Sequence, residues 1–171
     1  MELLREKIRT VPDFPKKGIL FYDLTPIMQD PVAFGQVLEA LAEPFERKRI
    51  EVVASMESRG FIFGAALAND LGAGFVPVRK PGKLPWKTSR YEYNLEYGKD
   101  ALEIHCDAIK PGQKVLIVDD VLATGGTAQA TAALLRQMDA EIVGASFVLE
   151  IGALEGRKKL DGLNVKSLCL V

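Results

Sequence analysis

Two adjacent carboxylates, Asp119 and Asp120, come directly after an apolar run at 115–118. A turn with two glycines and two threonines follows them: Ala123, Thr124, Gly125, Gly126 and Thr127. A strand that runs into such a turn and then into a helix brings backbone N–H groups and the positive helix terminus to one edge of a sheet, where they bind anions. Glycines let a phosphate approach the backbone closely, and threonine hydroxyls can donate to its oxygens. The pattern therefore predicts a phosphate site.

The presence of two acids at a phosphate site must be explained separately, because carboxylates beside a phosphate would repel it. A ligand that also carries hydroxyl groups or a metal ion removes this conflict, and a ribose phosphate with Mg2+ offers both. Successive strand residues point to opposite faces, so we expect Asp119 and Asp120 to converge only if the strand ends near them and the chain turns. The structural alternative is an ordinary strand end followed by a capped helix, which also favours Asp, Thr and Gly.

Two common nucleotide-binding motifs do not match this chain. No lysine follows Gly125 and Gly126 at the spacing of the nucleoside-triphosphate loop. The sequence at 72–74 imitates the start of the dinucleotide motif, but Pro77 stands where its third glycine belongs. A different kind of phosphate ligand is therefore expected.

Length and composition restrict the function further. The 171 residues suit one domain, and 48% hydrophobic with 26% charged residues is typical of a globular protein. The formal net charge of -1 offers no basic excess for nucleic acid or an anionic membrane. The longest apolar stretch, 60–68, is far shorter than the roughly 20 residues of a membrane-spanning helix. We expect no nucleic-acid partner and no membrane partner.

The N-terminal segment and the cysteines indicate the compartment. Residues 1–7 mix both charge signs and lack the apolar centre of a secretory signal, so we expect a cytoplasmic location. Cys106 and Cys169 have no closely spaced partner, and His105 is the one histidine, which excludes a disulfide framework and a zinc site. We expect His105 to face solvent from a strand.

Hydrophobic periodicity predicts alternating strands and helices, which is typical of an α/β fold with a parallel sheet and helical crossovers. The expected helices lie at 2–9, 31–47, 60–71 and 127–138, with Asp30 as the N-cap of the second. The expected strands lie at 52–54, 75–78, 115–118, 142–149 and 165–170, with two short ones around 91–93 and 102–104. The segments 11–26 and 80–90 are rich in proline and glycine and are interpreted as loops.

With these residues in view, the segment 115–127 resembles the motif with which type I phosphoribosyltransferases bind 5-phosphoribosyl 1-diphosphate. Further segments match signature segments of that family in the same order: 18–21, 57–64, 78–85 and 95–99. The resemblance covers nearly the whole chain. It implies one domain over 1–171, with a central, mostly parallel sheet, helices on both faces, an N-terminal hood at about 11–27 and a mobile loop at about 80–97.

The resemblance also implies roles for the residues already singled out. Asp119 and Asp120 would bind the ribose hydroxyls, and residues 123–127 would hold the 5′-phosphate. The residues implied for pyrophosphate are Ser58, Arg59, Arg79, Lys80 and Lys83. Carboxylates near the ribose would also favour the positive charge that develops at the anomeric carbon. Mg2+ is the implied cofactor, held mainly by substrate and water rather than by direct protein ligands.

The same resemblance assigns base recognition to other residues. Family members for hypoxanthine and guanine carry an acid where this chain has Ala123, so Glu96 is the candidate to move a proton on the base. Phe21 would stack on the base, and the backbone around Leu20 and Tyr22 would read its edge. Tyr22 stands where the family usually has Arg, so the resemblance assigns no side-chain role at this position.

The function implied is transfer of the phosphoribosyl group to adenine, which gives AMP and pyrophosphate in purine salvage. The alternatives are another base, xanthine or uracil, and a regulator that senses 5-phosphoribosyl 1-diphosphate and binds nucleic acid. Such a regulator should carry a basic face, which the net charge of -1 does not supply. The family further implies a homodimer.

Overall fold

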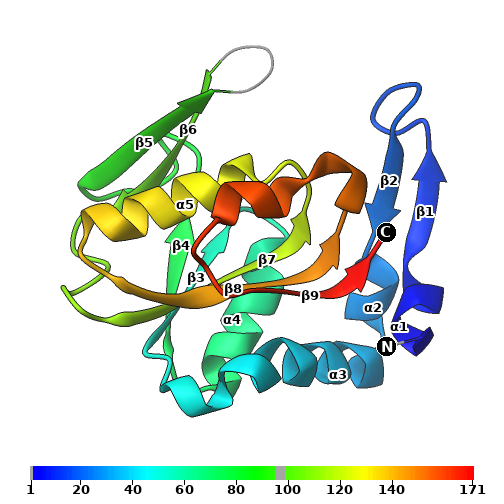
Figure 1. Cartoon of the computed structure of the whole chain (residues 1–171), viewed down its shortest axis with the longest axis horizontal. Helices are drawn as coiled ribbons and strands as arrows, with labels where there is room; N and C mark the ends of the chain where they lie inside the picture. The colour runs from blue at the N-terminus through cyan, green and yellow to red at the C-terminus, as the bar shows by residue number, and fades with distance from the viewer. Residues whose placement is uncertain (1, 95–98) are drawn as a thin grey trace.

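The computed structural model describes residues 2–94 and 99–171. Within these residues a parallel sheet of five strands forms the centre of the molecule (Figure 1). Its strands, in spatial order, are β4 (Gly74–Val78), β3 (Val52–Met56), β7 (Lys114–Leu122), β8 (Glu141–Glu150) and β9 (Val165–Leu170). The α/β fold with a mostly parallel sheet is therefore confirmed.

Helices cover both faces of this sheet, as the continuous burial of residues 115–118 on β7 requires. Leu116 and Val118 pack against the helices α2 (Thr25–Gln29), α3 (Pro31–Ala42) and α4 (Gly60–Asp70). Val115 and Ile117 point the other way and pack with α5 (Gly126–Gln137) and with the strands β5 (Thr88–Asn94) and β6 (Lys99–His105). The two layers are visible on opposite sides of the sheet in Figure 1.

Helix α3 begins where the sequence predicts. The Asp30 carboxylate accepts hydrogen bonds from the N–H groups of Val32 at 2.9 Å and Ala33 at 3.1 Å, so Asp30 is the N-cap. The α-helix ends at Ala42 rather than near 47, and a 3-10 turn, η1 (Glu43–Lys48), continues the chain. Pro44 explains the early end, because proline lacks the N–H that an α-helix needs at this point.

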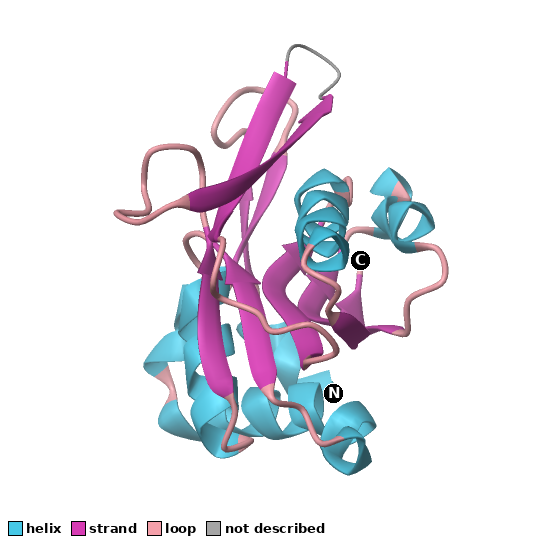
Figure 2. Cartoon of the chain, turned by 90° about the vertical axis from the view of Figure 1, so that its left-hand side faces the viewer, coloured by secondary structure: helices cyan, strands magenta, loops and turns pink. Residues whose placement is uncertain are grey.

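Two antiparallel hairpins flank the sheet at opposite ends of the molecule (Figure 1). Helix α1 (Glu2–Lys7) leads into β1 (Arg9–Pro12), which pairs with β2 (Leu20–Asp23). The expected loop at 11–26 thus contains part of a hairpin, which the sequence did not reveal because strands of four residues show little periodicity. The second hairpin, β5–β6, extends beyond the central sheet (Figure 2) and also contacts α5. The short strands expected around 91–93 and 102–104 are confirmed as parts of β5 and β6, and β5 begins earlier, inside the segment expected as a mobile loop at about 80–97.

Three further details differ from expectation. Strand β7 does not end near the acids but runs through Asp119 and Asp120 to Leu122. Two 3-10 turns, η2 (Gly152–Leu154) and η3 (Gly156–Leu160), follow β8. His105 is half-buried rather than facing solvent, and its Nε2 atom is covered. Among the described residues, no helix has the length and apolar character needed to cross a bilayer.

Candidate active site

The carboxyl ends of β3 and β7 form the edge at which the candidate residues meet. The two strands are parallel neighbours, and each is followed by a turn and a helix: α4 begins at Gly60 and α5 at Gly126. The chain passes from β3 to β4 on one side and from β7 to β8 on the other, so the strand order diverges between them. Open α/β sheets bind ligands in the crevice at such a divergence.

The turn after β7 encloses a small polar cavity. The cavity measures about 70 Å³ and is lined by Asp119 and the continuous segment 121–128, which includes all five residues predicted to hold a phosphate. Gly125 has φ +75°, a left-handed conformation that glycine adopts without strain, and it places the next N–H groups at the start of α5. Backbone donors and the positive helix end therefore surround the cavity.

Asp119 lies deep in this edge, against the first turn of α4. Its Oδ1 accepts the N–H of Asp120 at 2.9 Å, and a Cβ at Gly60 would collide with the same oxygen. Burial, and secondly the neighbouring Asp120 carboxylate, raise the pKa of Asp119 well above its usual value. Asp119 therefore retains a proton more readily than a free aspartate, which lowers the negative charge near a bound phosphate.

Asp120 is 6% exposed and faces the turn between β3 and α4. The Arg59 Nε atom lies 2.5 Å from its Oδ2, but the pair lacks the alignment of a hydrogen bond, so this buried oxygen has an unfilled acceptor position. The two acids thus reach the same edge although β7 does not end between them. A ligand hydroxyl is the kind of donor that Asp120 can still accept.

Arg59 also joins the N-terminal hairpin to this edge. Its guanidinium carbon lies 5.0 Å from the centroid of the Phe21 ring, within the range of a cation–π contact. Phe21 and Tyr22 on β2 are half-buried and Leu20 is exposed. The structure therefore brings the expected base-stacking residue to the expected ribose-binding residue, with one arginine between them.

The turn between β3 and α4 carries the other predicted pyrophosphate contacts. Ser58 is exposed there, and the Glu57–Ser58 peptide is cis. At the end of β4, the Arg79 Nε atom donates to Glu57 Oε2 at 2.6 Å, which places Arg79 beside this turn. Glu57 was missed by the sequence reasoning, although an acid next to Ser58 and Arg59 is a signal for a partner of a nearby cation.

Two lysines predicted for pyrophosphate lie farther out, on the loop between β4 and β5. Lys80 donates to Asp100 Oδ2 on β6 at 2.8 Å, and Lys83 is exposed. The Tyr93 hydroxyl donates to the same Asp100 oxygen at 3.2 Å, and a Cβ at Gly126 would lie 3.4 Å from the Tyr93 ring. Burial raises the pKa of Tyr93. Tyr93, which the sequence did not single out, thus connects the β5–β6 hairpin with the phosphate turn.

Glu96, the expected proton carrier, lies outside the described residues, as does its neighbour Tyr97. Among the residues that the structure does describe, no group of three or more His, Cys, Asp or Glu side chains is arranged to hold a metal ion. Asp119 is the acidic residue that lines the phosphate cavity, and its Oδ1 accepts the N–H of Asp120.

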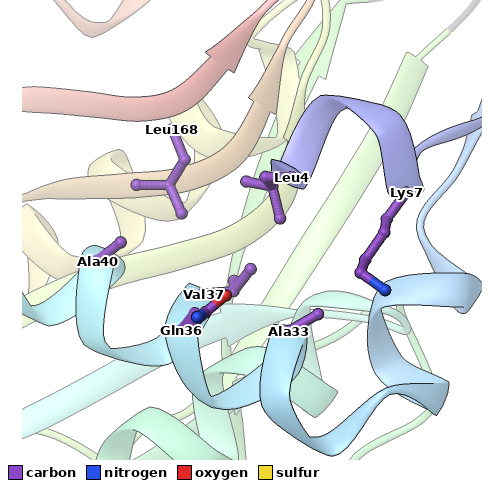
Figure 3. A pocket seen from close by; sticks show the side chains of 7 residues that line it. All are labelled: Leu4, Lys7, Ala33, Gln36, Val37, Ala40 and Leu168. Carbon is purple, nitrogen blue, oxygen red and sulfur yellow. The ribbon is translucent and has the colours of Figure 1, made fainter. Parts of the chain in front are cut away.

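A second, apolar pocket of about 230 Å³ contains none of the candidate residues (Figure 3). Side chains from α1, α3 and β9 surround it: Leu4, Lys7, Ala33, Gln36, Val37, Ala40 and Leu168. The ammonium of Lys7 is paired with Asp30 at 2.6 Å. This pocket offers little polar chemistry, and the carboxyl edge of β3 and β7 is the better candidate.

Comparison with known proteins identifies the family of the chain. The family model for the "Phosphoribosyl transferase domain" matches residues 33–169. An adenine phosphoribosyltransferase from Acidobacterium capsulatum is 56% identical over 167 residues, which cover 98% of this chain and 92% of that protein. One from Methylococcus capsulatus is 54% identical over 168 residues, with 98% of each chain covered.

Solved structures give the same result for the fold. The crystal structure of adenine phosphoribosyltransferase from Thermoanaerobacter pseudethanolicus has a TM-score of 0.96 at 52% identity and covers 99% of each chain. The enzyme from Saccharomyces cerevisiae, complexed with an imino-altritol bisphosphate and adenine, has a TM-score of 0.89 at 43% identity and covers 97% of this chain and 95% of its own. The similarity thus extends over both hairpins as well as the sheet.

Proposed function

The chain belongs to the phosphoribosyltransferase family, and from that premise we propose that it transfers the phosphoribosyl group of 5-phosphoribosyl 1-diphosphate to adenine. The products are AMP and pyrophosphate, and the reaction salvages a purine base. The observation that carries this function is the meeting of Asp120, Arg59 and the turn at 123–127 on one sheet edge. Such an edge can take a ligand with a phosphate, sugar hydroxyls and a diphosphate.

The ribose 5-phosphate part of the substrate occupies the edge after β7. The turn at 123–127 binds the 5′-phosphate through its backbone N–H groups and the hydroxyls of Thr124 and Thr127. Asp119 and Asp120 accept the ribose hydroxyls. As the bond to pyrophosphate breaks, positive charge develops at the anomeric carbon, and nearby carboxylate charge stabilises it.

The diphosphate part lies against the turn after β3. Arg59 is the main cation there, because a planar guanidinium matches two phosphate oxygens at once. As it turns to the diphosphate it moves away from Asp120 Oδ2, which has no hydrogen-bond donor among the described residues and accepts a ribose hydroxyl. Ser58 and Arg79 assist at the same turn, while Lys80 and Lys83 approach from the loop after β4.

Adenine enters between the N-terminal hairpin and the ribose. Phe21 stacks on the ring, and the backbone around Leu20 and Tyr22 reads its edge. Glu96 moves the proton on the base, because Ala123 leaves the phosphate turn without an acid for this task. The relatives named adenine phosphoribosyltransferase favour adenine over xanthine or uracil.

Mg2+, a homodimer and a cytoplasmic location complete the proposal. The site fits Mg2+ because the unfilled, buried Oδ2 of Asp120 lies beside the expected diphosphate position. When bound, the ion neutralises diphosphate charge and helps pyrophosphate to leave. Asp119 and Asp120 would support it through water and ribose oxygens, with substrate oxygens as its main ligands.

A product assay tests the function. The protein is incubated with 5-phosphoribosyl 1-diphosphate, Mg2+ and one nucleobase at a time, and the nucleotides are separated and identified. We expect AMP with adenine and little product with hypoxanthine, guanine, xanthine or uracil. Formation of only IMP or only UMP would overturn the assignment of the base, and no nucleotide from any base would overturn the transferase function.

A further inference from the structure

Beyond the residues that contact substrate, the structure shows two glycine backbones packed against each other at the phosphate turn. A Cβ on Gly125 would lie 2.9 Å from the carbonyl carbon of Gly156 and 3.0 Å from its Cα. A Cβ on Gly156 would lie 2.8 Å from the Gly125 nitrogen and would collide with the Ala123 carbonyl oxygen. Carbon atoms in favourable contact are separated by about 3.5–4.0 Å, so neither position has room for a side chain.

The φ of Gly125 is +75°, so the conformation of its own turn favours glycine at this position. The φ of Gly156 lies outside the left-handed region, so its backbone conformation does not require glycine. What excludes a side chain at Gly156 is its neighbour, the backbone of the phosphate turn. The segment η3 therefore packs directly against the backbone of Ala123 and Gly125.

An ion pair between Arg157, which is half exposed, and the buried Glu150 ties η3 to the sheet. Arg157, the next residue, donates its Nε to Glu150 Oε1 at 3.0 Å and one terminal nitrogen to Glu150 Oε2 at 2.5 Å. Its other terminal nitrogen donates to the Val165 carbonyl at 2.7 Å, and the Ser167 hydroxyl donates to Glu150 Oε2 at 2.7 Å. Glu150 is 6% exposed and ends β8. The two-pronged geometry is specific to a guanidinium.

We propose that Gly156 and Arg157 are positioning residues for the 5′-phosphate turn. Arg157 anchors η3 to Glu150 on the sheet, and Gly156 then supports Ala123 and Gly125 by direct backbone contact. Neither residue lines the phosphate cavity, so both act through the turn. The inference rests on the proposed function, because it takes residues 123–127 to be the site of the 5′-phosphate.

The variant Gly156→Ala tests this role, with Gly152→Ala as a matched control from the preceding turn. A Cβ on Gly152 would meet the end of the Leu170 side chain at 3.2 Å, which can move aside, rather than the phosphate turn. The probes are ribose 5-phosphate and pyrophosphate, each titrated with Mg2+ by calorimetry. The thermal unfolding of each variant is measured in parallel.

We expect Gly156→Ala to weaken ribose 5-phosphate binding about tenfold, which corresponds to about 1.4 kcal/mol. Its affinity for pyrophosphate should stay at the wild-type value, because that ligand binds at the turn after β3. In steady-state kinetics, KM for 5-phosphoribosyl 1-diphosphate should rise more than kcat falls. Gly152→Ala should match the wild type in both titrations.

Arg157→Lys provides an independent test that keeps the charge and the backbone. It should weaken ribose 5-phosphate binding selectively, since lysine cannot reproduce the two-pronged contact with Glu150. If Gly156→Ala fails to fold, Arg157→Lys alone tests the positioning role.

Unchanged ribose 5-phosphate affinity in the folded variants, or an equal loss for both ligands, would overturn the positioning role. Failure of the wild-type protein to bind ribose 5-phosphate would instead overturn the 5′-phosphate assignment, and the inference with it.

Discussion

Arg59 and Asp120 form an ion pair, 2.5 Å from Nε to Oδ2, between the two turns that the proposed substrate must occupy. The same guanidinium covers the Phe21 ring at 5.0 Å. One cation therefore lies across the expected ribose and base positions. Binding of the diphosphate would draw Arg59 toward a stronger, doubly charged partner and open the ribose site at the same time.

Replacing Asp120 by Asn should lower kcat by about 10²–10³-fold, because the variant loses a charge that stabilises the transition state. The fold should persist, since Asn has nearly the same shape. The measurement is the initial rate of AMP formation at saturating substrate, with thermal unfolding as the check on folding. Asp70→Asn, on the exposed end of α4, is the control. A near-normal rate for Asp120→Asn would remove its ribose assignment.

Replacing Arg59 by Lys should raise KM for 5-phosphoribosyl 1-diphosphate about tenfold, because lysine keeps the charge but loses the two-pronged contact and the stacking on Phe21. Pyrophosphate affinity, measured by calorimetry, should fall by a similar factor while ribose 5-phosphate affinity changes little. Arg90→Lys, at an exposed position on β5, is a matched control. Equal losses for both ligands would contradict the assignment of Arg59 to the diphosphate.

Replacing Glu96 by Gln should slow the chemical step by about 10²-fold, the usual contribution of a positioned acid or base. Affinity for 5-phosphoribosyl 1-diphosphate should remain close to wild type, because Glu96 is assigned to the base alone. Single-turnover rates and a binding titration separate the two effects. Glu92→Gln, an exposed neighbour on β5, serves for comparison. An unchanged single-turnover rate would dismiss Glu96 as the proton carrier.

The raised pKa of Asp119 predicts a pH-dependent stability. Burial and Asp120 favour the protonated form in the folded state, so the folded protein binds this proton more tightly than the unfolded chain. Linkage then requires this group's contribution to fall as pH rises from the unfolded value near 3.8 up to the raised folded value, and to level off above it. The carboxylate is therefore a cost to stability at neutral pH.

Asp119→Asn should remove that cost. We expect its Tm to exceed that of the wild type by a margin that grows with pH through this window, by about 2–4 °C for each 1 kcal/mol of added stability. Its kcat should nevertheless fall. Calorimetric melting at several pH values checks the trend, with Asp70→Asn as the exposed control. A margin that is constant or shrinks as pH rises would contradict the raised pKa.

Much of the fold could be predicted from the sequence because its strands are short, apolar and separated by helical periods. The run at 115–118 is buried on both faces, as its unbroken apolar pattern indicates. The N-cap at Asp30 and the strand at 165–170 are confirmed. The hairpin β1–β2 and the turns η2 and η3 were not predicted, since short exposed elements carry no periodic signal and depend on tertiary contacts.

The candidate site, like the fold, could be predicted from the sequence only in part. Asp119, Asp120 and the turn at 123–127 are contiguous in sequence, so their chemistry could be read directly. The extension of β7 through the acids could not, because it depends on pairing with β8 as far as Leu122. Nor could the backbone contact between Gly125 and Gly156, since residues far apart in the chain meet there only after the sheet has formed.

Calorimetric titration of the wild-type protein with 5-phosphoribosyl 1-diphosphate and Mg2+ tests the central claim most directly. The claim is that the edge after β3 and β7 holds a ribose carrying both phosphate groups. We expect saturable heat with one site per chain, strongly reduced in Arg59→Lys. The absence of heat from the folded wild-type protein, under conditions where Mg2+ and the substrate are intact, would contradict the account.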